Sequence, residues 1–285
     1  MAESSTGGIS SAEAALLARA RYEVMPLPDV SRRAVAELPR GATVTVTASP
    51  TRAPSATVAV VEQLATAGFD PVPHLAARSV RDDAELAGIL ARLADAGVRD
   101  VFVVGGDARE PVGRFTDALG LIEAVERIGP RPARIGVASY PDGHHRIDDA
   151  TLWASLRAKQ EHADYTVTQL CFDAETVGRF VAEARAHGID LPVVAGVPGV
   201  VDTPRLLRAA VRVGVGDAMR FARTNPATAA SLLRPGAYRP TGLVRGLARQ
   251  VADGRCAIAG LHLYTFNEIA PTVRWLRAEQ RRAAA

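Results

Sequence analysis

The sequence contains few cysteines, lysines and aromatic residues, and it has no long apolar run. Among 285 residues there are two cysteines, Cys171 and Cys256, and aromatic residues make up 5%. Two separate cysteines support neither a disulfide framework nor a cysteine-rich zinc site. The longest apolar stretches are strand-sized, far below the ~20 residues of a membrane helix, so we expect no membrane association. Residues 1–11 lack the basic and apolar blocks of a targeting peptide, so we expect a cytoplasmic location.

Charge is nearly balanced, which bears on the partners of the protein. The chain has 34 basic and 31 acidic residues, for a net charge of +3, and Lys159 is its only lysine. So small an excess argues against nucleic acid as a partner. Hydrophobic residues make up 48% and charged residues 23%, which is ordinary for a soluble globular protein and excludes a disordered chain, a collagen-like fibre and a coiled coil.

Short apolar runs alternate with segments of helical period along most of the chain. Several of these runs are continuous and rich in valine, the pattern of parallel strands covered on both faces. The strands that we predict cover residues 20–25, 43–48, 70–75, 100–105, 134–140, 165–172, 192–197 and 260–266. Eight strands with helices between them predict a (β/α)8 TIM barrel, whose usual length is ~250 residues. A doubly wound open sheet is the alternative, but no G-x-G-x-x-G follows the first strand.

The barrel is expected to occupy residues 20–285 as a single domain, after a tail and short helix in residues 1–19. The helix is placed at residues 12–20, and a final helix at residues 271–282. Residues 214–253 are longer than a normal crossover and are interpreted as a helical insertion before the last strand, with a loop at residues 234–236. Homo-oligomerisation stays open.

Polar residues stand where the predicted strands end, which is where barrel enzymes place their function. This set comprises Glu23, Thr47, His74, Asp107, Tyr140, His144, Gln169 and Tyr264. Simpler interpretations remain open: Glu23 could pair with an arginine, His74 could be a core histidine, and Asp107 could cap the next helix. Gln169 falls inside a predicted strand, where its amide needs hydrogen-bond partners.

Motif patterns narrow the chemistry of this set. There is no H-x-H or H-E-x-x-H spacing, and the adjacent His144 and His145 would point apart on a strand, so we expect no metal site. Neither a G-x-S-x-G elbow nor a P-loop occurs. The donors, acceptors and carboxylates that remain suit a flat heteroaromatic ligand.

These residues resemble the methylenetetrahydrofolate reductase family, with six motifs in the family's order between residues 21 and 276. The motifs are Tyr22-Glu23-x-x-Pro26, Pro73-His74-Leu75, Gly106-Asp107, Tyr140-Pro141-x-x-His144, Thr168-Gln169-x-x-Phe172-Asp173 and Leu261-His262-Leu263-Tyr264-Thr265-x-Asn267. The resemblance implies a TIM-barrel oxidoreductase of one-carbon metabolism and methionine biosynthesis. Such enzymes interconvert 5,10-methylenetetrahydrofolate and 5-methyltetrahydrofolate with NAD(P)H as electron donor and FAD as cofactor.

The resemblance also implies roles for individual residues. Glu23 would assist the protonation that opens the methylene bridge, and Asp107 would bind the pterin near the flavin. Gln169, Arg205 and Phe266 would bind the folate substrate. The residues that match FAD-binding positions are Thr47, His74, Gly106, Asp107, Phe115, Tyr140, His144 and Lys159.

The chain departs from the family pattern at several positions. Gly105 replaces an arginine, the flavin-binding acid and amide are not evident around residues 151–155, and Glu268 replaces the arginine that meets the folate tail. Loss of charge-assisted hydrogen bonds weakens the binding of a diphosphate group. One hypothesis is therefore that flavin binds weakly or not at all, and that NAD(P)H donates hydride directly. A second is that Arg205 supplies the charge lost at Glu268.

Two other functions are weighed against this assignment. A folate- or flavin-binding paralogue without turnover is the main alternative, although retention of both Glu23 and Asp107 argues against it. A Schiff-base lyase has little support, because Lys159 is not placed at a strand end.

Overall fold

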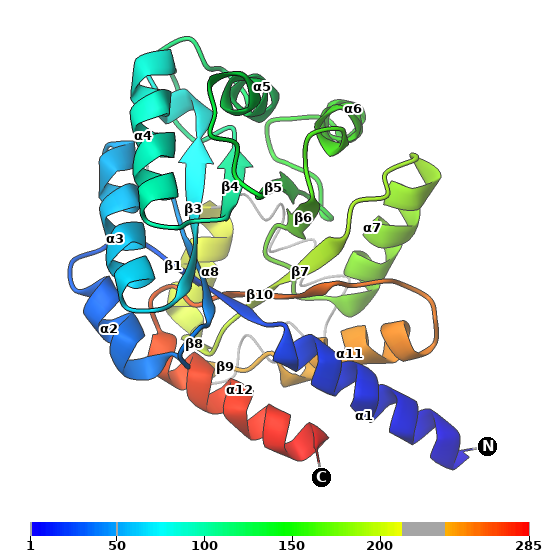
Figure 1. The fold of residues 1–285 in the computed structure, drawn as a ribbon. Helices are drawn as coiled ribbons and strands as arrows, with labels where there is room; N and C mark the ends of the chain where they lie inside the picture. The colour runs from blue at the N-terminus through cyan, green and yellow to red at the C-terminus, as the bar shows by residue number, and fades with distance from the viewer. Residues whose placement is uncertain (1, 50, 213–236, 285) are drawn as a thin grey trace. The chain divides into compact units, whose positions relative to one another are not determined.

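The computed structural model describes residues 2–49, 51–212 and 237–284, and eight strands in it close into a barrel (Figure 1). The strands are β1 (Arg21–Val24), β2 (Thr43–Val46), β3 (Asp70–Ala76), β4 (Asp100–Val104), β5 (Arg134–Ser139), β6 (Tyr165–Thr168), β7 (Val193–Pro198) and β10 (Gly260–Tyr264). Their order around the barrel is β1-β10-β7-β6-β5-β4-β3-β2, and the neighbours whose register is assigned run parallel. The predicted TIM-barrel fold is confirmed.

Seven of the eight strands begin and end within two residues of their predicted bounds, but β6 was predicted too long. It ends at Thr168, not at Phe172. The chain leaves the sheet because the Leu170 amide bonds to the side-chain oxygen of Gln169. The Cys171 amide then donates to the carbonyl of Gly196 on β7. Gln169 therefore follows the strand and does not lie inside it.

Helices connect the strands. They are α1 (Ala2–Ala18), α2 (Val30–Glu37), α3 (Pro54–Thr66), η1 (Ala77–Ser79, a 3-10 helix), α4 (Asp83–Asp95), α5 (Ala118–Ile128), α6 (Asp149–Gln160), α7 (Ala174–Ala186), α8 (Thr203–Arg212), α11 (Thr241–Ala252) and α12 (Ile269–Ala283). Helix α4 shows how the sequence sets its bounds. Asp82 caps it by accepting a hydrogen bond from the Glu85 amide at 2.8 Å, and Gly97 follows its end with a φ of +73°. Its apolar stripe, Leu86, Ile89, Leu90 and Leu93, is buried.

Helix α1 begins ten residues before its predicted start at residue 12. Leu16 and Leu17 near its C-terminal end are buried, and the buried Glu13 forms an ion pair with Arg282 of α12. Once one part of a helix is held by tertiary contacts, each further residue adds at low cost. Composition alone therefore placed the start too late.

The region before the last strand contains a small antiparallel sheet that the sequence did not predict, formed by β8 (Val201–Asp202) and β9 (Ala237–Tyr238). Helix α11 lies within residues 214–253, where a helical insertion was predicted. The predicted loop at residues 234–236 lies outside the described residues. Within the described ranges, no helix has the length and apolar character required to cross a membrane.

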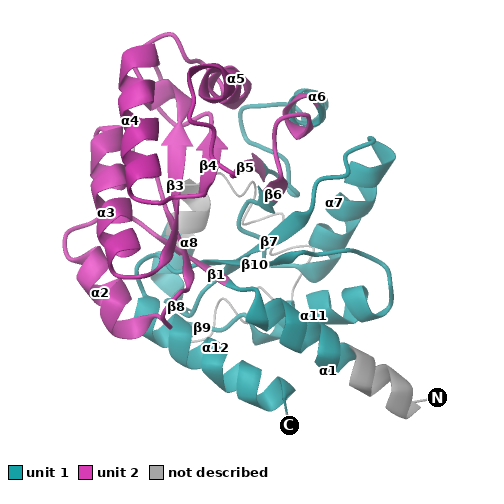
Figure 2. Cartoon of the chain, in the orientation of Figure 1, with its two compact units in different colours: residues 1–20, 139–157, 167–285 teal, residues 21–138, 158–166 magenta. Residues whose placement is uncertain are grey.

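The chain divides into two compact units (Figure 2). Unit 1 comprises residues 1–20, 139–157 and 167–285, and unit 2 comprises residues 21–138 and 158–166. The division into a tail of residues 1–19 and a barrel domain of residues 20–285 stays a prediction.

The amino-terminal ends of the strands in unit 2 surround the ring of Tyr165. Its hydroxyl donates to Asp100 Oδ1 at 2.9 Å, and the guanidinium carbons of Arg21 and Arg134 lie 4.6 and 4.8 Å from the ring centroid. Gly136 on β5 provides the space, since a Cβ there would lie 2.3 Å from Tyr165 Cζ. In TIM barrels this end supports stability, not catalysis.

We expect Asp100 to make stability depend on pH. Burial raises the pKa of this carboxyl to about 6, against the opposing effects of Arg21, Tyr165 and Arg134. The folded state therefore binds the proton more tightly than the unfolded state, so stability should fall as the pH rises from about 4 to about 6. A shift of this size corresponds to at most about 3 kcal/mol. Urea unfolding from pH 4 to pH 8 measures the effect.

Asp100→Asn should remove this pH dependence, because the amide resembles the protonated acid. The control is Asp95→Asn, which changes an exposed acid on α4. If the difference in unfolding free energy between wild type and Asp100→Asn stays constant from pH 4 to pH 8, the assigned titration is wrong.

Candidate active site

In unit 2, Glu23 on β1 and His74 on β3 lie together at the carboxyl ends of their strands. Glu23 Oε2 is 3.8 Å from His74 Nε2, and each side chain is only 13% exposed. The His74 ring also contacts Phe102 of β4, with centroids 4.7 Å apart. Glu23 thus has a histidine as a close neighbour. A partly buried acid held beside an imidazole is suited to proton transfer.

Thr45 on β2 is a residue that the sequence analysis missed. It is the register partner of Glu23, is 1% exposed, and its hydroxyl has no hydrogen-bond partner within the described part of the chain. A buried hydroxyl without a partner is unusual and is suited to bind a ligand or a water molecule. The sequence could have indicated this residue. Side chains two positions apart in a strand share a face, so Thr45 lies on the same face as Thr47.

Gly106 and Asp107 lie in the loop that follows β4, which we call the β4–α5 loop (residues 105–117). Gly106 has a φ of +92°, a conformation that favours glycine. Asp107 is exposed and is not the cap of α5, because Asp117 holds that position and accepts a hydrogen bond from the Gly120 amide at 3.0 Å. The capping interpretation of Asp107 is therefore excluded.

Among the other unit 2 residues predicted to bind FAD, Phe115 and Lys159 are buried and Thr47 is partly buried. Phe115 is 4% exposed, and the guanidinium carbon of Arg114 lies 4.8 Å from its ring centroid. Lys159 near the end of α6 is 7% exposed, and burial lowers its pKa to about 8, partly offset by Asp117. Thr47 follows β2, and its carbonyl accepts the Thr57 hydroxyl at 3.0 Å.

In unit 1, Gln169 directly follows β6. Its backbone N–H donates to the Ser139 carbonyl at 2.7 Å, and its side-chain Oε1 accepts a hydrogen bond from the backbone N–H of Leu170 at 2.8 Å. The bond from Leu170 thus satisfies Oε1, one of the side-chain atoms for which a partner was expected. It also orients the side-chain amide, because Nε2 must then point away from the Leu170 N–H.

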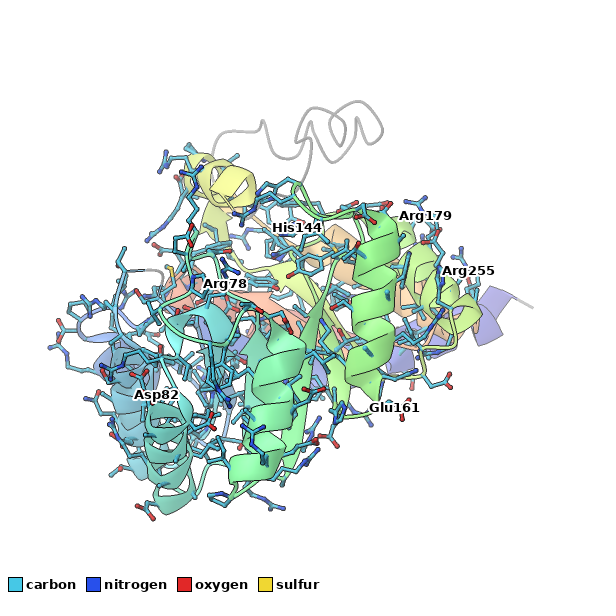
Figure 3. The ribbon with its side chains drawn as sticks, turned by 90° about the horizontal axis from the view of Figure 1, so that it is seen from above. Arg78, Asp82, His144, Glu161, Arg179 and Arg255 are labelled. Carbon is cyan, nitrogen blue, oxygen red and sulfur yellow. The ribbon has the colours of Figure 1, made fainter. Side chains whose placement is uncertain are left out.

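Tyr140 and His144 lie in the loop after β5, and their rings meet edge to face with centroids 5.0 Å apart. His144 is labelled in Figure 3. The expectation that His144 and His145 point apart was wrong, because their rings stack with centroids 4.7 Å apart. The two residues lie in a turn, not in a strand: Gly143 has a φ of +74°, and the Arg146 amide donates to His144 Nδ1.

Tyr264 and Phe266 form an aromatic pair at the end of β10. The Tyr264 hydroxyl donates to the Thr168 carbonyl at 3.0 Å, and the two rings stack with centroids 6.5 Å apart. Phe266 and Asn267 have φ values of 50° and 63°, which cost about 1–3 kcal/mol each for non-glycine residues. Both rings pack against a buried apolar cluster of Leu170, Phe172, Val201, Leu206 and Tyr238. Strain held in place by packing is typical of functional sites.

Arg205 at the start of α8 forms an ion pair with Glu268, which follows β10. The two side chains are 43% and 35% exposed. The positive charge that the resemblance assigns to the folate tail is thus paired with the carboxylate of Glu268. An anionic ligand at Arg205 would have to compete with this carboxylate.

In the described ranges, no group of three or more histidine, cysteine, aspartate or glutamate side chains is placed to hold a metal ion. In unit 2 the strand ends carry an acid beside a histidine and an exposed acid, and in unit 1 they carry an oriented amide and an aromatic pair. The fold is that of a TIM-barrel protein.

Comparison with known proteins identifies the family. The methylenetetrahydrofolate reductase model matches residues 23–276. Methylenetetrahydrofolate reductase 1 of Schizosaccharomyces pombe is 28% identical over 144 residues, which is 47% of this chain and 24% of that protein. The 5,10-methylenetetrahydrofolate reductase of Pectobacterium carotovorum is 27% identical over 151 residues, which is 52% of this chain and 50% of the relative. The matched part thus spans half or less of these relatives.

A solved structure shares the fold at 10% identity. It is an uncharacterized Clostridium thermocellum protein that binds two copies of 5-methyl-5,6,7,8-tetrahydrofolic acid, with a TM-score of 0.64 over 93% of this chain and 96% of that one. The family match covers most of the sequence, and the chain belongs to the methylenetetrahydrofolate reductase family, a family of folate-dependent one-carbon oxidoreductases.

Proposed function

We propose that the protein interconverts 5,10-methylenetetrahydrofolate and 5-methyltetrahydrofolate, with NAD(P)H as the hydride donor in the reductive direction. The balanced reaction is methylenetetrahydrofolate plus NAD(P)H plus a proton, giving methyltetrahydrofolate and NAD(P)⁺. The observation that carries the proposal is the Glu23–His74 pair at the carboxyl ends of β1 and β3, in a chain of this family. The folate-binding neighbour of the same fold adds support for the ligand class.

Glu23 is the proton donor in this proposal. Protonation of N10 breaks its bond to the methylene carbon and leaves an iminium ion at N5, which then accepts the hydride and becomes the methyl group. The His74 imidazole lies 3.8 Å from this carboxyl, close enough to favour its placement at the strand end. A positioned acid of this kind typically contributes 10²–10⁴-fold to the rate.

Asp107, Gln169 and Phe266 bind the pterin in this proposal. The Asp107 carboxylate accepts hydrogen bonds from the pterin and stabilises the cationic iminium. The fixed Gln169 amide presents its Nε2 donor, and Phe266 offers an aromatic face for the flat ring. Each of these contacts would help to place the methylene carbon near the hydride donor, as hydride transfer requires.

The described residues do not fit FAD well. Gly105 stands where the resemblance expects an arginine, and three of the five N–H donors of nearby Arg78 are used by backbone carbonyls, which leaves fewer donors for a diphosphate. Phe115 is buried beneath Arg114, and Lys159 is itself buried. We therefore propose that the reaction proceeds without a tightly bound flavin.

An NAD(P)H oxidation assay with 5,10-methylenetetrahydrofolate, run with and without added FAD, tests the proposal. We expect folate-dependent oxidation in both arms, and no flavin absorbance near 450 nm in the purified protein. Stoichiometric flavin in the purified protein would overturn the flavin-free version. Absence of oxidation in both arms, together with binding of 5-methyltetrahydrofolate, would favour a non-catalytic folate-binding paralogue.

The Arg205–Glu268 pair leads to a prediction about the folate tail. Glu268→Gln removes the carboxylate that competes for Arg205, so the KM for a triglutamylated folate should fall about 3- to 5-fold relative to the monoglutamate, as expected for a partly exposed ion pair. Arg205→Ala should have the opposite effect. Steady-state kinetics with both substrates measure the ratio.

The matched control is Glu183→Gln, which changes an exposed acid on α7. The quantity compared is the ratio of the KM for the triglutamylated folate to the KM for the monoglutamate. If this ratio is the same in wild type, Glu268→Gln and Arg205→Ala, then Arg205 does not contact the folate tail.

A further inference from the structure

Arg78 connects the segment after β3 to the β4–α5 loop. It lies in η1 and is labelled in Figure 3. Its Nε donates to the Ala108 carbonyl at 2.7 Å, its Nη2 to the Arg109 carbonyl at 2.6 Å, and its Nη1 to the Thr116 carbonyl at 3.1 Å. One side chain thus bonds both ends of the loop that carries Asp107.

The backbone of Arg78 contacts the same loop. Its amide donates to the Gly105 carbonyl at 3.0 Å, and its carbonyl accepts the Val112 amide at 3.0 Å. These two bonds hold the loop before and after Asp107, while the guanidinium bonds the residues directly following it. Five hydrogen bonds from one residue leave the loop little freedom to move as a body.

Close packing along this segment supports the same conclusion. A Cβ at Gly106 would lie 3.2 Å from Ala76 Cβ, and a Cβ at Gly113 would lie 1.8 Å from the Arg81 carbonyl oxygen. The loop backbone therefore lies directly against residues 76–81. Two glycines permit the approach, and Arg78 supplies the polar contacts.

We propose that Arg78 is a positioning residue that holds the β4–α5 loop so that Asp107 is placed to bind the pterin; this rests on the proposed function. The planar guanidinium suits the role, because its fixed fork of donors can satisfy several carbonyls at once, whereas a lysine offers a single point of donation. Three of its five N–H donors are engaged with carbonyls of the loop, so we assign Arg78 a role that acts through the loop that carries Asp107.

A double-mutant cycle tests the coupling to Asp107. Arg78→Ala and Arg78→Lys should each lower kcat/KM for 5,10-methylenetetrahydrofolate about 10- to 100-fold, the effect expected when a binding group is displaced by about 1 Å. In an Asp107→Asn background, Arg78→Ala should lower it less than about 3-fold, because residues that act together are not additive. Equal fold-losses in the two backgrounds, or no loss at all, would overturn the proposal.

Hydrogen exchange measured by mass spectrometry separates the positioning role from the proposed function. Amides of residues 105–117 should exchange faster in Arg78→Ala, while Arg81→Gln, a neighbouring arginine paired with Glu85, should leave them unchanged. Unchanged exchange in Arg78→Ala would overturn the positioning role even if the enzyme turns over. If wild type neither turns over nor binds folate, the proposed function fails, and the exchange result still decides whether Arg78 holds the loop.

Discussion

Glu23→Gln should lower kcat/KM for 5,10-methylenetetrahydrofolate by 100-fold or more. The amide keeps the size of the side chain beside His74 but cannot donate a carboxyl proton to N10, and general acid catalysis is typically worth 10²–10⁴-fold. Binding of 5-methyltetrahydrofolate, measured by calorimetry, should change only a few-fold, because the group is required mainly in the transition state.

Glu123→Gln is the matched control, since Glu123 is an exposed acid on α5. Both variants should unfold within a few degrees of wild type. Wild-type turnover in Glu23→Gln would remove this residue from the mechanism, whereas a loss of binding equal to the loss of kcat/KM would make it a ligand contact.

Gly136→Ala should destabilise the protein by about 3 kcal/mol, at the upper end of the usual cost of overpacking a core. The new Cβ would lie 2.3 Å from Tyr165 Cζ, and this ring is held by Asp100 and two arginines, so it cannot move aside without breaking those contacts. Thermal unfolding should show a drop in Tm of roughly 6–12 °C, given 2–4 °C per kcal/mol in a chain of this size.

Gly88→Ala is the control for the same chemical change. Gly88 lies in α4, where a Cβ meets no atom within 4 Å, so alanine should stabilise the helix by about 0.5–1 kcal/mol. Similar Tm values for Gly136→Ala and Gly88→Ala would show that Tyr165 does not fill the space beside Gly136.

The barrel was predictable from the sequence because each element carries its own local signal. Buried parallel strands are apolar on both faces, and helices such as α4 combine an apolar stripe with an acidic cap and a terminal glycine. Bounds failed where a side chain changed the backbone path, as Gln169 does at the end of β6, or where tertiary packing extended a helix, as in α1. The sheet of β8 and β9 has only two residues in each strand, too few for a periodic signal.

The sequence predicts residues for the candidate site but not their contacts. Strand ends and motif order predict Glu23, His74, Asp107 and Gln169 as site residues, yet no local pattern indicates that Arg78 bonds the loop that carries Asp107. The same holds for Arg205, whose acidic partner lies 63 residues further along the chain.

The sequence by itself determined the alternation of strands and helices, the order of the motifs and the family, because these depend on side chains read in order along the chain. Only the tertiary structure decided that Tyr165 lies against Gly136 and Asp100, that His144 and His145 stack, and that Arg205 is neutralised by Glu268. Those facts depend on distances between segments far apart in the chain or on the turn of a loop. Such distances are set by packing of the whole chain, which no local pattern encodes.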